Sequence, residues 1–357
     1  MKHVELINNF RIQGTVIDIA PLGNGLINDT YLVRTAQSDK PDYVLQRINH
    51  HIFTDVELLQ HNIEAVTRHL RKKLEAQGVD DIDRRVLRFV PTDSGKTYHF
   101  DGESYWRMSI YIADTLTVSE VTPQSSYDCG RAFGHFEQQL TDLDEPLGET
   151  IPDFHNMELR LRQLHEAVSH DRVGRLKTVT SEVALIEAHA DEMCLAERLH
   201  REGQLPKRIC HCDTKVNNML FDREGRVLCV IDLDTVMPAY VFSDYGDFLR
   251  TAANTEPEDS PRLDNIAFRW DIFQSFTRGY LESAGPFLTP VERRHLPFAV
   301  ALFPFMQATR FLTDYLNGDT YYKISYADHN LVRTRNQLRL FELIQARRDE
   351  MSQVTEP

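Results

Sequence analysis

The pattern of hydrophobic and polar residues changes partway along the chain, near residue 112. Before that point, apolar and polar residues alternate in short runs bounded by turn-prone residues, which is typical of strands. Runs at 15–21, 30–35 and 43–48, completed by runs at 86–91, 97–101 and 104–112, predict a five-stranded antiparallel sheet. Between them, apolar residues recur at helical spacing from 55 to 78 and predict one long amphipathic helix.

Beyond residue 125 the period becomes helical and stays so almost to the end of the chain. The helices that this pattern predicts cover 127–140, 181–202, 264–284, 290–314 and 326–353. Polar, turn-prone residues at 113–114 separate the two regimes. We therefore expect an α+β protein with two domains: residues 1–112 around the sheet, and a larger, mostly helical domain over residues 113–357.

One stretch inside the helical region breaks the pattern and carries the strongest chemical signal. Residues 209–235 read ICHCDTKVNNMLFDREGRVLCVIDLDT, in which His211-x-Asp213 is followed by Asn218 and then by two short apolar runs joined by a turn. The runs predict a hairpin that ends at Asp232. Such a hairpin would bring Asn218 and Asp232 to the same end.

These groups, in this order, are the ones that phosphoryl transfer from ATP requires. One carboxylate accepts the hydroxyl proton, an amide oxygen helps to hold magnesium, and a second carboxylate bridges the metal to the phosphates. Taken singly, Asp213, Asn218 and Asp232 are each explained as well by a helix cap, a turn or a strand end. Together, at this spacing, they favour a kinase-type catalytic loop.

The stretch resembles the aminoglycoside phosphotransferase and choline kinase superfamily, and within it the N-acetylhexosamine 1-kinases. The similar segments are HCDTKVNNMLFD, VIDLDTVMPAYVFSDYGDFLRTAAN, PLGNGLINDTYLV and RFLTDYLNGDTYYKI, so the resemblance covers nearly the whole chain. It implies a two-lobed, protein-kinase-like fold, with the sheet and its helix as the nucleotide-binding lobe. It also implies ATP as phosphoryl donor, Mg²⁺ as cofactor and a small sugar as acceptor.

The resemblance assigns roles around the catalytic loop. Asp213 would orient and deprotonate the acceptor hydroxyl, His211 would brace the loop, and Asn218 and Asp232 would bind magnesium. Asp234 would touch a second metal ion or the sugar. Two further carboxylates, in SDYGDF, resemble the aspartate that braces this loop by hydrogen bonds; they are Asp244 and Asp247.

The nucleotide would be held by the first domain. The turn Gly23-Asn24-Gly25 can lie close over phosphates. Taken alone it favours an ordinary hairpin turn, and its position ahead of the catalytic loop is what supports the phosphate role. Alignment places Arg47 where the superfamily usually has lysine, with a surface arginine as the alternative, and Glu64 as the carboxylate that would orient it. The main-chain groups of Ile110 and Ile112 would contact adenine.

The acceptor would lie near the turn between the last two helices, where charged and aromatic residues gather. Arg310 and Tyr321 are the predicted contacts, because a sugar stacks its apolar face on a ring while polar side chains bind its hydroxyls. His155 and Arg160 are weaker candidates. A helix-loop-helix with capping polar groups is the alternative explanation for Arg310 and Tyr321, and ordinary surface positions are the alternative for His155 and Arg160.

Composition narrows the function classes further. Of the 357 residues, 41% are hydrophobic and 26% charged, which is ordinary for a globular enzyme. The net charge of −14, with no basic run, argues against nucleic-acid binding. No apolar run has the length of a signal peptide or a membrane span, and five cysteines, an odd number, favour a reducing, cytoplasmic location.

The sequence therefore predicts an ATP- and Mg²⁺-dependent kinase that phosphorylates the anomeric hydroxyl of N-acetylhexosamines. Two alternatives stay open: a kinase for another small acceptor, such as an amino alcohol, homoserine or an aminoglycoside, and a nucleotide-binding scaffold without catalysis. A third, a hydrolase of modified sugars, has no nucleophile elbow, zinc signature or sulfatase-like cysteine motif to support it. The oligomeric state is not predicted.

Overall fold

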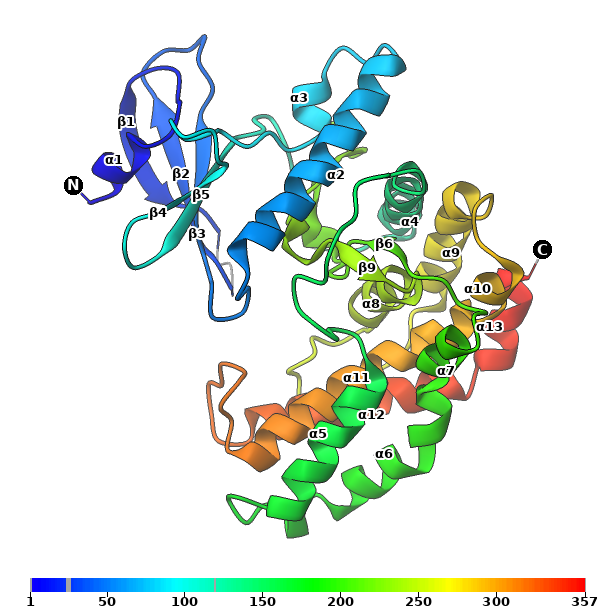
Figure 1. Ribbon diagram of the computed structural model, residues 1–357. Helices are drawn as coiled ribbons and strands as arrows, with labels where there is room; N and C mark the ends of the chain where they lie inside the picture. Colours follow the sequence, from blue (N-terminus) through cyan, green and yellow to red (C-terminus); the bar gives the residue numbers. More distant parts are fainter. Residues whose placement is uncertain (1, 24–26, 119, 357) are drawn as a thin grey trace. The chain divides into compact units, whose positions relative to one another are not determined.

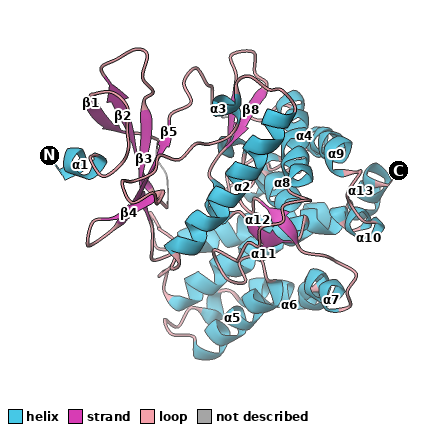
Figure 2. Cartoon of the chain, turned by 45° about the horizontal axis from the view of Figure 1, so that its top comes forward, coloured by secondary structure: helices cyan, strands magenta, loops and turns pink. Residues whose placement is uncertain are grey.

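A computed structural model describes residues 2–23, 27–118 and 120–356 of the chain (Figure 1). The chain divides into two compact units. The first comprises residues 1–117, 142–152 and 219–237, and the second comprises 118–141, 153–218 and 238–357. The mixed architecture, an antiparallel sheet in one unit and mostly helices in the other, confirms the predicted α+β class (Figure 2). The domain boundary at residue 112 stays a prediction.

The first unit is built on a five-stranded sheet of order β1-β2-β3-β5-β4, in which neighbouring strands run antiparallel. The bounds are β1 Val16–Pro21, β2 Asp29–Thr35, β3 Tyr43–Ile48, β4 Tyr98–Phe100 and β5 Tyr105–Ile110. The run at 86–91, which the pattern also suggested as a strand, is not one. It instead follows β5 through single backbone hydrogen bonds, among them Val90 N–H to Met108 C=O at 2.8 Å.

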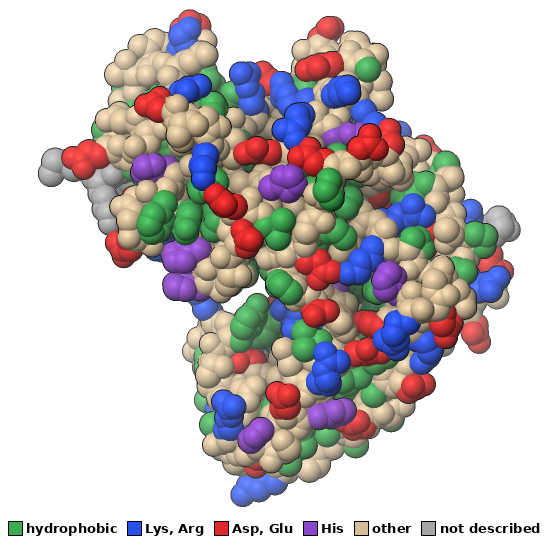
Figure 3. Space-filling view, in the orientation of Figure 1, with side chains coloured by type: hydrophobic (Ala, Val, Ile, Leu, Met, Phe, Trp, Pro, Cys, Tyr) green, Lys and Arg blue, Asp and Glu red, His purple; other side chains and the backbone are tan. Residues whose placement is uncertain are grey.

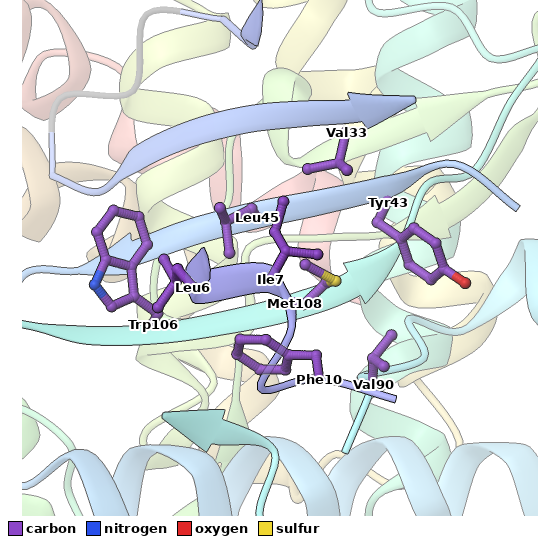
Figure 4. Close-up of a cluster of buried hydrophobic side chains, with 9 residues drawn as sticks. All are labelled: Leu6, Ile7, Phe10, Val33, Tyr43, Leu45, Val90, Trp106 and Met108. Atoms are coloured by element: carbon purple, nitrogen blue, oxygen red, sulfur yellow. The ribbon is translucent and has the colours of Figure 1, made fainter. Parts of the chain in front are cut away.

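One face of the sheet is closed by the short helix α1 (Lys2–Ile7). Alternation along β3 and β5 turns every second residue toward this helix, and these side chains form one apolar core (Figure 4). Its buried members are Leu6, Ile7, Phe10, Val33, Tyr43, Leu45, Val90, Trp106 and Met108. Because Tyr43 and Leu45 point into this core, Gln46 points to the opposite face of the strand.

The long helix α2 (Val56–Ala76) begins where Asp55 caps it, its carboxylate accepting the Leu58 N–H at 2.9 Å. It buries amides as well as apolar residues, and the amide of Asn62 donates to the carbonyls of Gly148 and Val236 at 2.8 Å each. The bond to Val236 ties α2 to the segment that follows the hairpin of β7 (Met219–Phe221) and β8 (Val227–Val230). The short helix α3 (Ile82–Arg85) also belongs to this unit.

The second unit is mostly helical, with one two-stranded sheet of β6 (Arg208–Cys210) and β9 (Met237–Ala239). Its longer helices are α4 Pro123–Gln139, α5 Met157–His170, α6 Thr180–Met193, α8 Phe242–Ala252, α9 Trp270–Ala284, α11 Leu296–Asn317 and α12 His329–Gln345. Its shorter helices are α7 Leu195–Arg201, α10 Pro290–Arg294 and α13 Arg348–Thr355. Helix α11 is buried along most of its length and packs against α5, α8 and α12 (Figure 1).

Helices α4 and α9 pack unusually closely because glycines face backbone across the contact. A Cβ at Gly279 would lie 2.1 Å from the carbonyl oxygen of Tyr127, and one at Gly130 would lie 2.3 Å from that of Phe276. Residues larger than glycine would therefore force these helices apart. Among the described residues, no helix is long and apolar enough to cross a membrane.

Three predicted helices are each split in two. Residues 290–314 form α10 and α11, with Pro297 in the first turn of α11, where its missing N–H is harmless. Residues 326–353 divide near Arg347, and 181–202 divide near Cys194. Charged side chains of both signs are interspersed on the face shown in Figure 3. Along α2 they pair, for example Arg71 with Asp83 at 2.7 Å.

Candidate active site

The loop after β6 takes a conformation that needs support. Cys212 has φ 63°, in the left-handed region that non-glycine residues rarely occupy. The carboxylate of Asp244, on α8, accepts the backbone N–H groups of His211 and Cys212 at 2.8 and 2.7 Å. The hydroxyl of Thr214 donates to the carbonyl of Asp244 at 2.7 Å. The bracing role predicted for Asp244 is confirmed.

His211 is fully buried beneath this loop. Its ring meets the rings of Phe133 and Phe136 edge to face, with centroids 5.7 and 6.1 Å apart, and its Nδ1 accepts the Asp213 N–H at 3.3 Å. Such a residue can hold the loop in place but presents no surface to a substrate. Its environment favours the bracing role over proton transfer.

Asp213 lies at the tip of the loop, held by two side chains. The ammonium of Lys215 lies 2.6 Å from Oδ1, and the amide of Asn218 donates to Oδ2 at 3.1 Å and to the Asp213 carbonyl at 2.8 Å. Burial alone would raise the pKa of Asp213, but the Lys215 ammonium, together with His211 and the Asn218 amide, outweighs burial and lowers the pKa below its ordinary value. Asp213 is thus kept as a carboxylate.

Asn218 and Asp232 flank the β7–β8 hairpin in the chain. Met219 pairs with Val230, so Asn218 directly precedes the open end of the hairpin and Asp232 follows it by two residues. Asp232 has φ 60° and ψ 58°, a left-handed conformation that is uncommon outside glycine and clusters at functional sites. Asn218 belongs to the second unit and Asp232 to the first.

Asp234 is buried within the first unit and is not open to a ligand. Its carboxylate pairs with Arg107 at 2.5 Å and accepts the amide N–H of Asn28 at 2.7 Å. Arg107, from β5, also donates to the side-chain oxygens of Gln46 at 2.9 Å and Gln60 at 3.4 Å. The contact to a sugar or second metal expected for Asp234 is therefore replaced by a buried ion pair.

The residues predicted to bind nucleotide are placed as follows. Gly23 has φ 70°, while Asn24 and Gly25 lie outside the described residues. Arg47 is half-exposed and pairs with Asp29, whereas Glu64 accepts the Thr97 hydroxyl at 2.5 Å. The structure thus gives both members of the expected Arg47–Glu64 pair other partners.

The main-chain groups assigned to adenine contact are partly committed to the protein. The N–H of Ile110 donates to the Arg88 carbonyl at 2.9 Å, and the carbonyl of Ile112 accepts the Thr115 hydroxyl at 3.2 Å. Their role in adenine binding stays a prediction.

The residues predicted to bind the acceptor do come together, within the second unit. The guanidinium of Arg310 lies over the rings of Phe154 and Tyr322, 5.4 and 5.7 Å from their centroids. Tyr321 meets Tyr322 edge to face, with centroids 4.8 Å apart, and is 60% exposed. The turn that carries both tyrosines is held by the Asp314 carboxylate, which accepts the N–H groups of residues 320–322 at 2.8 to 3.0 Å.

Arg160 adds a second cation to this acceptor cluster of Phe154, Arg310, Tyr321 and Tyr322. Its guanidinium donates to the Phe154 carbonyl at 2.6 Å, and its Nε is buried and has no hydrogen-bond partner in the part of the chain that the structure describes. Burial, reinforced by the charge of Arg310, lowers the pKa of Arg160 to about 10. His155 is half-buried beside them, and desolvation together with the charges of Arg310 and Arg160 lowers its pKa well below the ordinary value. The charge of Asp153 acts on Arg160 in the opposite direction and favours its charged form.

Sequence reasoning missed three polar residues of these sites. Lys215 stands two residues after Asp213, and that spacing within one loop was a usable signal. Arg107 and Asn28 have no local signal, because both are defined by a partner far away in the chain, Asp234. Only the folded structure brings them together.

Comparison with known proteins adds a family. A model described as "Phosphotransferase enzyme family" matches residues 18–282. Solved structures with similar folds include amicoumacin kinase hAmiN in complex with AMP-PNP, Ca²⁺ and Ami, at 14% identity and TM-score 0.61, over 96% of this chain and 92% of that one. A microcompartment-associated aminopropanol kinase is 18% identical with TM-score 0.62, over 98% of both chains. Choline kinase LicA from Streptococcus pneumoniae is 15% identical with TM-score 0.53, over 96% and 98%. These likenesses support the kinase-like fold.

We expect a buried and a half-exposed arginine–aspartate pair of the first unit to contribute very differently to stability. Asp234→Ala leaves the Arg107 charge buried and unpaired, with both side chains under 5% exposed, and should lower the free energy of unfolding by about 3 kcal/mol or more. Asp29→Ala breaks the Arg47 pair, whose side chains are 49% and 48% exposed, and should cost at most about 1 kcal/mol. Urea titration of both variants measures the difference, and equal losses would refute this ranking.

Proposed function

The chain belongs to the phosphotransferase enzyme family and is a small-molecule kinase, and from this premise we propose that it transfers the γ-phosphoryl group of ATP to the anomeric hydroxyl of an N-acetylhexosamine. The observation that carries the kinase chemistry is the ionised Asp213, held between Lys215 and Asn218 on a loop braced by Asp244. The sugar acceptor is supported by the resemblance of the sequence and by the acceptor cluster.

In this mechanism Asp213 is the residue that meets the acceptor hydroxyl. Its carboxylate orients the hydroxyl and accepts its proton as the bond to phosphorus forms. Lys215 keeps Asp213 ionised. Its ammonium would also contact the transferred phosphoryl group and stabilise the negative charge there. The transition state is loose, so positioning and charge stabilisation supply most of the rate enhancement.

Magnesium would be held by Asn218 and Asp232. The chemistry of the two side chains fits, because an amide oxygen and a carboxylate are hard oxygen ligands. The amide nitrogen of Asn218 is bound to Asp213, which directs its oxygen away from that carboxylate, and the left-handed backbone of Asp232 is the kind of strain found at functional sites. The bound metal would neutralise charge on the phosphates.

The phosphates of ATP would also require a cation from the first unit, and Arg47 remains the proposed one. The ion pair between Arg47 and Asp29 is half-exposed, so breaking it costs at most about 1 kcal/mol. Arg47 can therefore leave Asp29 and bind a phosphate at little cost in free energy. Arg107 is less suited, because it is buried and committed to Asp234. The turn at Gly23 and the main chain of Ile110 and Ile112 complete the proposed nucleotide site.

The charge of the acceptor cluster discriminates between acceptor classes. Arg160 and Arg310 would repel the ammonium groups of choline, amino alcohols and aminoglycosides, whose binding calls for acidic surfaces. A neutral sugar faces no such cost, and it can stack on Tyr321 while Arg310 donates to its hydroxyl or acetamido oxygens. The acceptor cluster thus supports a sugar over the cationic alternatives.

The proposal is tested by measuring ADP release from ATP and Mg²⁺ across a panel of acceptors. The panel comprises N-acetylglucosamine, N-acetylgalactosamine, glucose, galactose, choline, homoserine and kanamycin. We expect turnover with the two N-acetylhexosamines and none with choline or kanamycin. Turnover confined to a cationic acceptor would overturn the sugar assignment, and ATP binding without turnover on any acceptor would favour the non-catalytic scaffold.

The pH dependence of kcat/KM tests the Asp213–Lys215 pair. Asp213 must be ionised, so activity is lost as pH falls through its lowered pKa. In Lys215→Met the ammonium is gone and burial is opposed only by His211 and the Asn218 amide, so this acidic limb should move to higher pH. Asp213→Asn should lose about 100-fold or more in kcat and keep its ATP affinity in calorimetry. An unmoved limb in Lys215→Met would show that Lys215 does not set the ionisation of Asp213.

Two exposed residues of the same loop offer a matched test of acceptor binding. Tyr321→Ala removes the proposed stacking ring and should raise KM for the sugar about tenfold, with KM for ATP unchanged. Ile324→Ala, 39% exposed, is the control and should leave both constants unchanged. Equal effects of the two substitutions would exclude a specific role for Tyr321.

A further inference from the structure

Three buried side chains from different elements of the second unit meet beneath the catalytic loop. Glu137 comes from α4, Cys210 ends β6 and Asp244 lies on α8. Their carboxylate and thiol atoms all lie within 4.8 Å of one another, and none of the three side chains is more than 2% exposed. Burying two carboxylates this far from water costs free energy unless their charge is compensated or removed.

The hydrogen bonds of the two carboxylates are unequal. Asp244 accepts two backbone N–H groups, one on each oxygen. Glu137 Oε2 accepts the Tyr280 hydroxyl at 2.6 Å, while its Oε1 is buried and receives no hydrogen bond from a described donor. An orphaned carboxylate oxygen beside a second carboxylate is unfavourable if both are ionised, but becomes a donor if it carries a proton.

Charge considerations point the same way. Two carboxylates this close cannot both ionise without a cation, so one of them keeps a proton. The two N–H donors stabilise negative charge on Asp244, whereas among the described donors one, the Tyr280 hydroxyl, does so on Glu137. Burial and the Asp244 charge raise the pKa of Glu137 well above its ordinary value. Asp244 is therefore the anion and Glu137 the acid.

The surrounding groups do not favour a metal ion in place of the proton. Burial raises the pKa of the Cys210 thiol well above its ordinary value, so it is not a thiolate ligand. Both Asp244 oxygens already accept N–H groups, and the neighbouring Glu292 is paired with Arg208 at 2.7 Å. The remaining titratable neighbours are His211, Cys212 and Tyr280.

We propose that Glu137 is a positioning residue, which keeps its proton in the folded enzyme and donates it from Oε1 to Asp244. The O–H···O⁻ bond fixes the carboxylate that holds the backbone of His211 and Cys212, and through it the position of Asp213. Charge-assisted bonds of this kind are short and strong. The kinetic consequence rests on the proposed kinase activity, whereas the protonation state does not.

The kinetic test compares two variants of similar size. Glu137→Gln keeps a donor for Asp244 and an acceptor for Tyr280, so kcat should stay within about twofold of wild type. Glu137→Met offers no donor, and kcat should fall about tenfold or more, with KM for ATP little changed. Equal loss of kcat in both variants, after circular dichroism has shown that both fold, would overturn the proposal.

Two further measurements report whether Glu137 is protonated, and neither needs an acceptor substrate. Infrared spectra of the wild type should show the carbonyl stretch of a buried carboxylic acid, and Glu137→Gln should lack it. Because the folded protein binds this proton more tightly than the unfolded chain, wild-type stability relative to Glu137→Gln should fall as pH rises above the ordinary glutamate pKa.

Three results would overturn the assignment: an infrared spectrum without the acid band, a stability difference that does not change with pH, or a stoichiometric metal ion in the purified wild type that Glu137→Gln lacks. These readouts hold even if Glu137→Met fails to fold. They also separate the two proposals, because an enzyme inactive on every acceptor would refute the sugar kinase and leave the infrared result intact.

Discussion

The catalytic loop depends on one buried carboxylate. Asp244 binds two successive backbone N–H groups, at His211 and Cys212, and this support offsets the left-handed conformation that Cys212 adopts. Without it the chain would leave β6 in a more relaxed conformation, and Asp213 would point elsewhere. Several helices of the second unit keep this carboxylate away from water. Asp244 lies on α8, helices α4 and α9 cover it, and glycines at the α4–α9 contact allow those two helices to approach closely.

The same physical problem, a charge held away from water, recurs in the first unit with another solution. There Asp234 pairs with Arg107 and accepts the amide N–H of Asn28, while Arg107 also donates to the amide oxygen of Gln46. An arginine can satisfy a carboxylate and two amides at once because its guanidinium has five donors in a fixed plane. Beneath the catalytic loop, the proposed proton on Glu137 would stabilise the Asp244 carboxylate, as Arg107 stabilises Asp234. Both arrangements fix the backbone that carries functional residues.

The acceptor cluster brings two cations together instead. Arg160 and Arg310 contact rings, carbonyls and amides, and the charge of the Asp153 carboxylate acts on Arg160. In a family whose members share one fold and differ in acceptor, such local charge is where specificity must be decided. The fold alone supports every alternative that the sequence left open. The sign of this charge argues for a neutral acceptor.

Local patterns were sufficient wherever one element or one loop decides the outcome. Periodicity predicted the sheet and the helix α2, and the spacing of Asp213, Asn218 and Asp232 indicated a kinase-type loop. The bracing of that loop by Asp244 was expected from its motif. Tertiary structure decided which distant groups meet: Arg107 with Asp234, Glu64 with Thr97, and Glu137 with Asp244. Strand parity shows that Gln46 and not Arg47 faces away from the apolar core, but nothing local says that Arg107 lies opposite Gln46. Such pairings are set by sheet register and helix packing, which are properties of the whole chain.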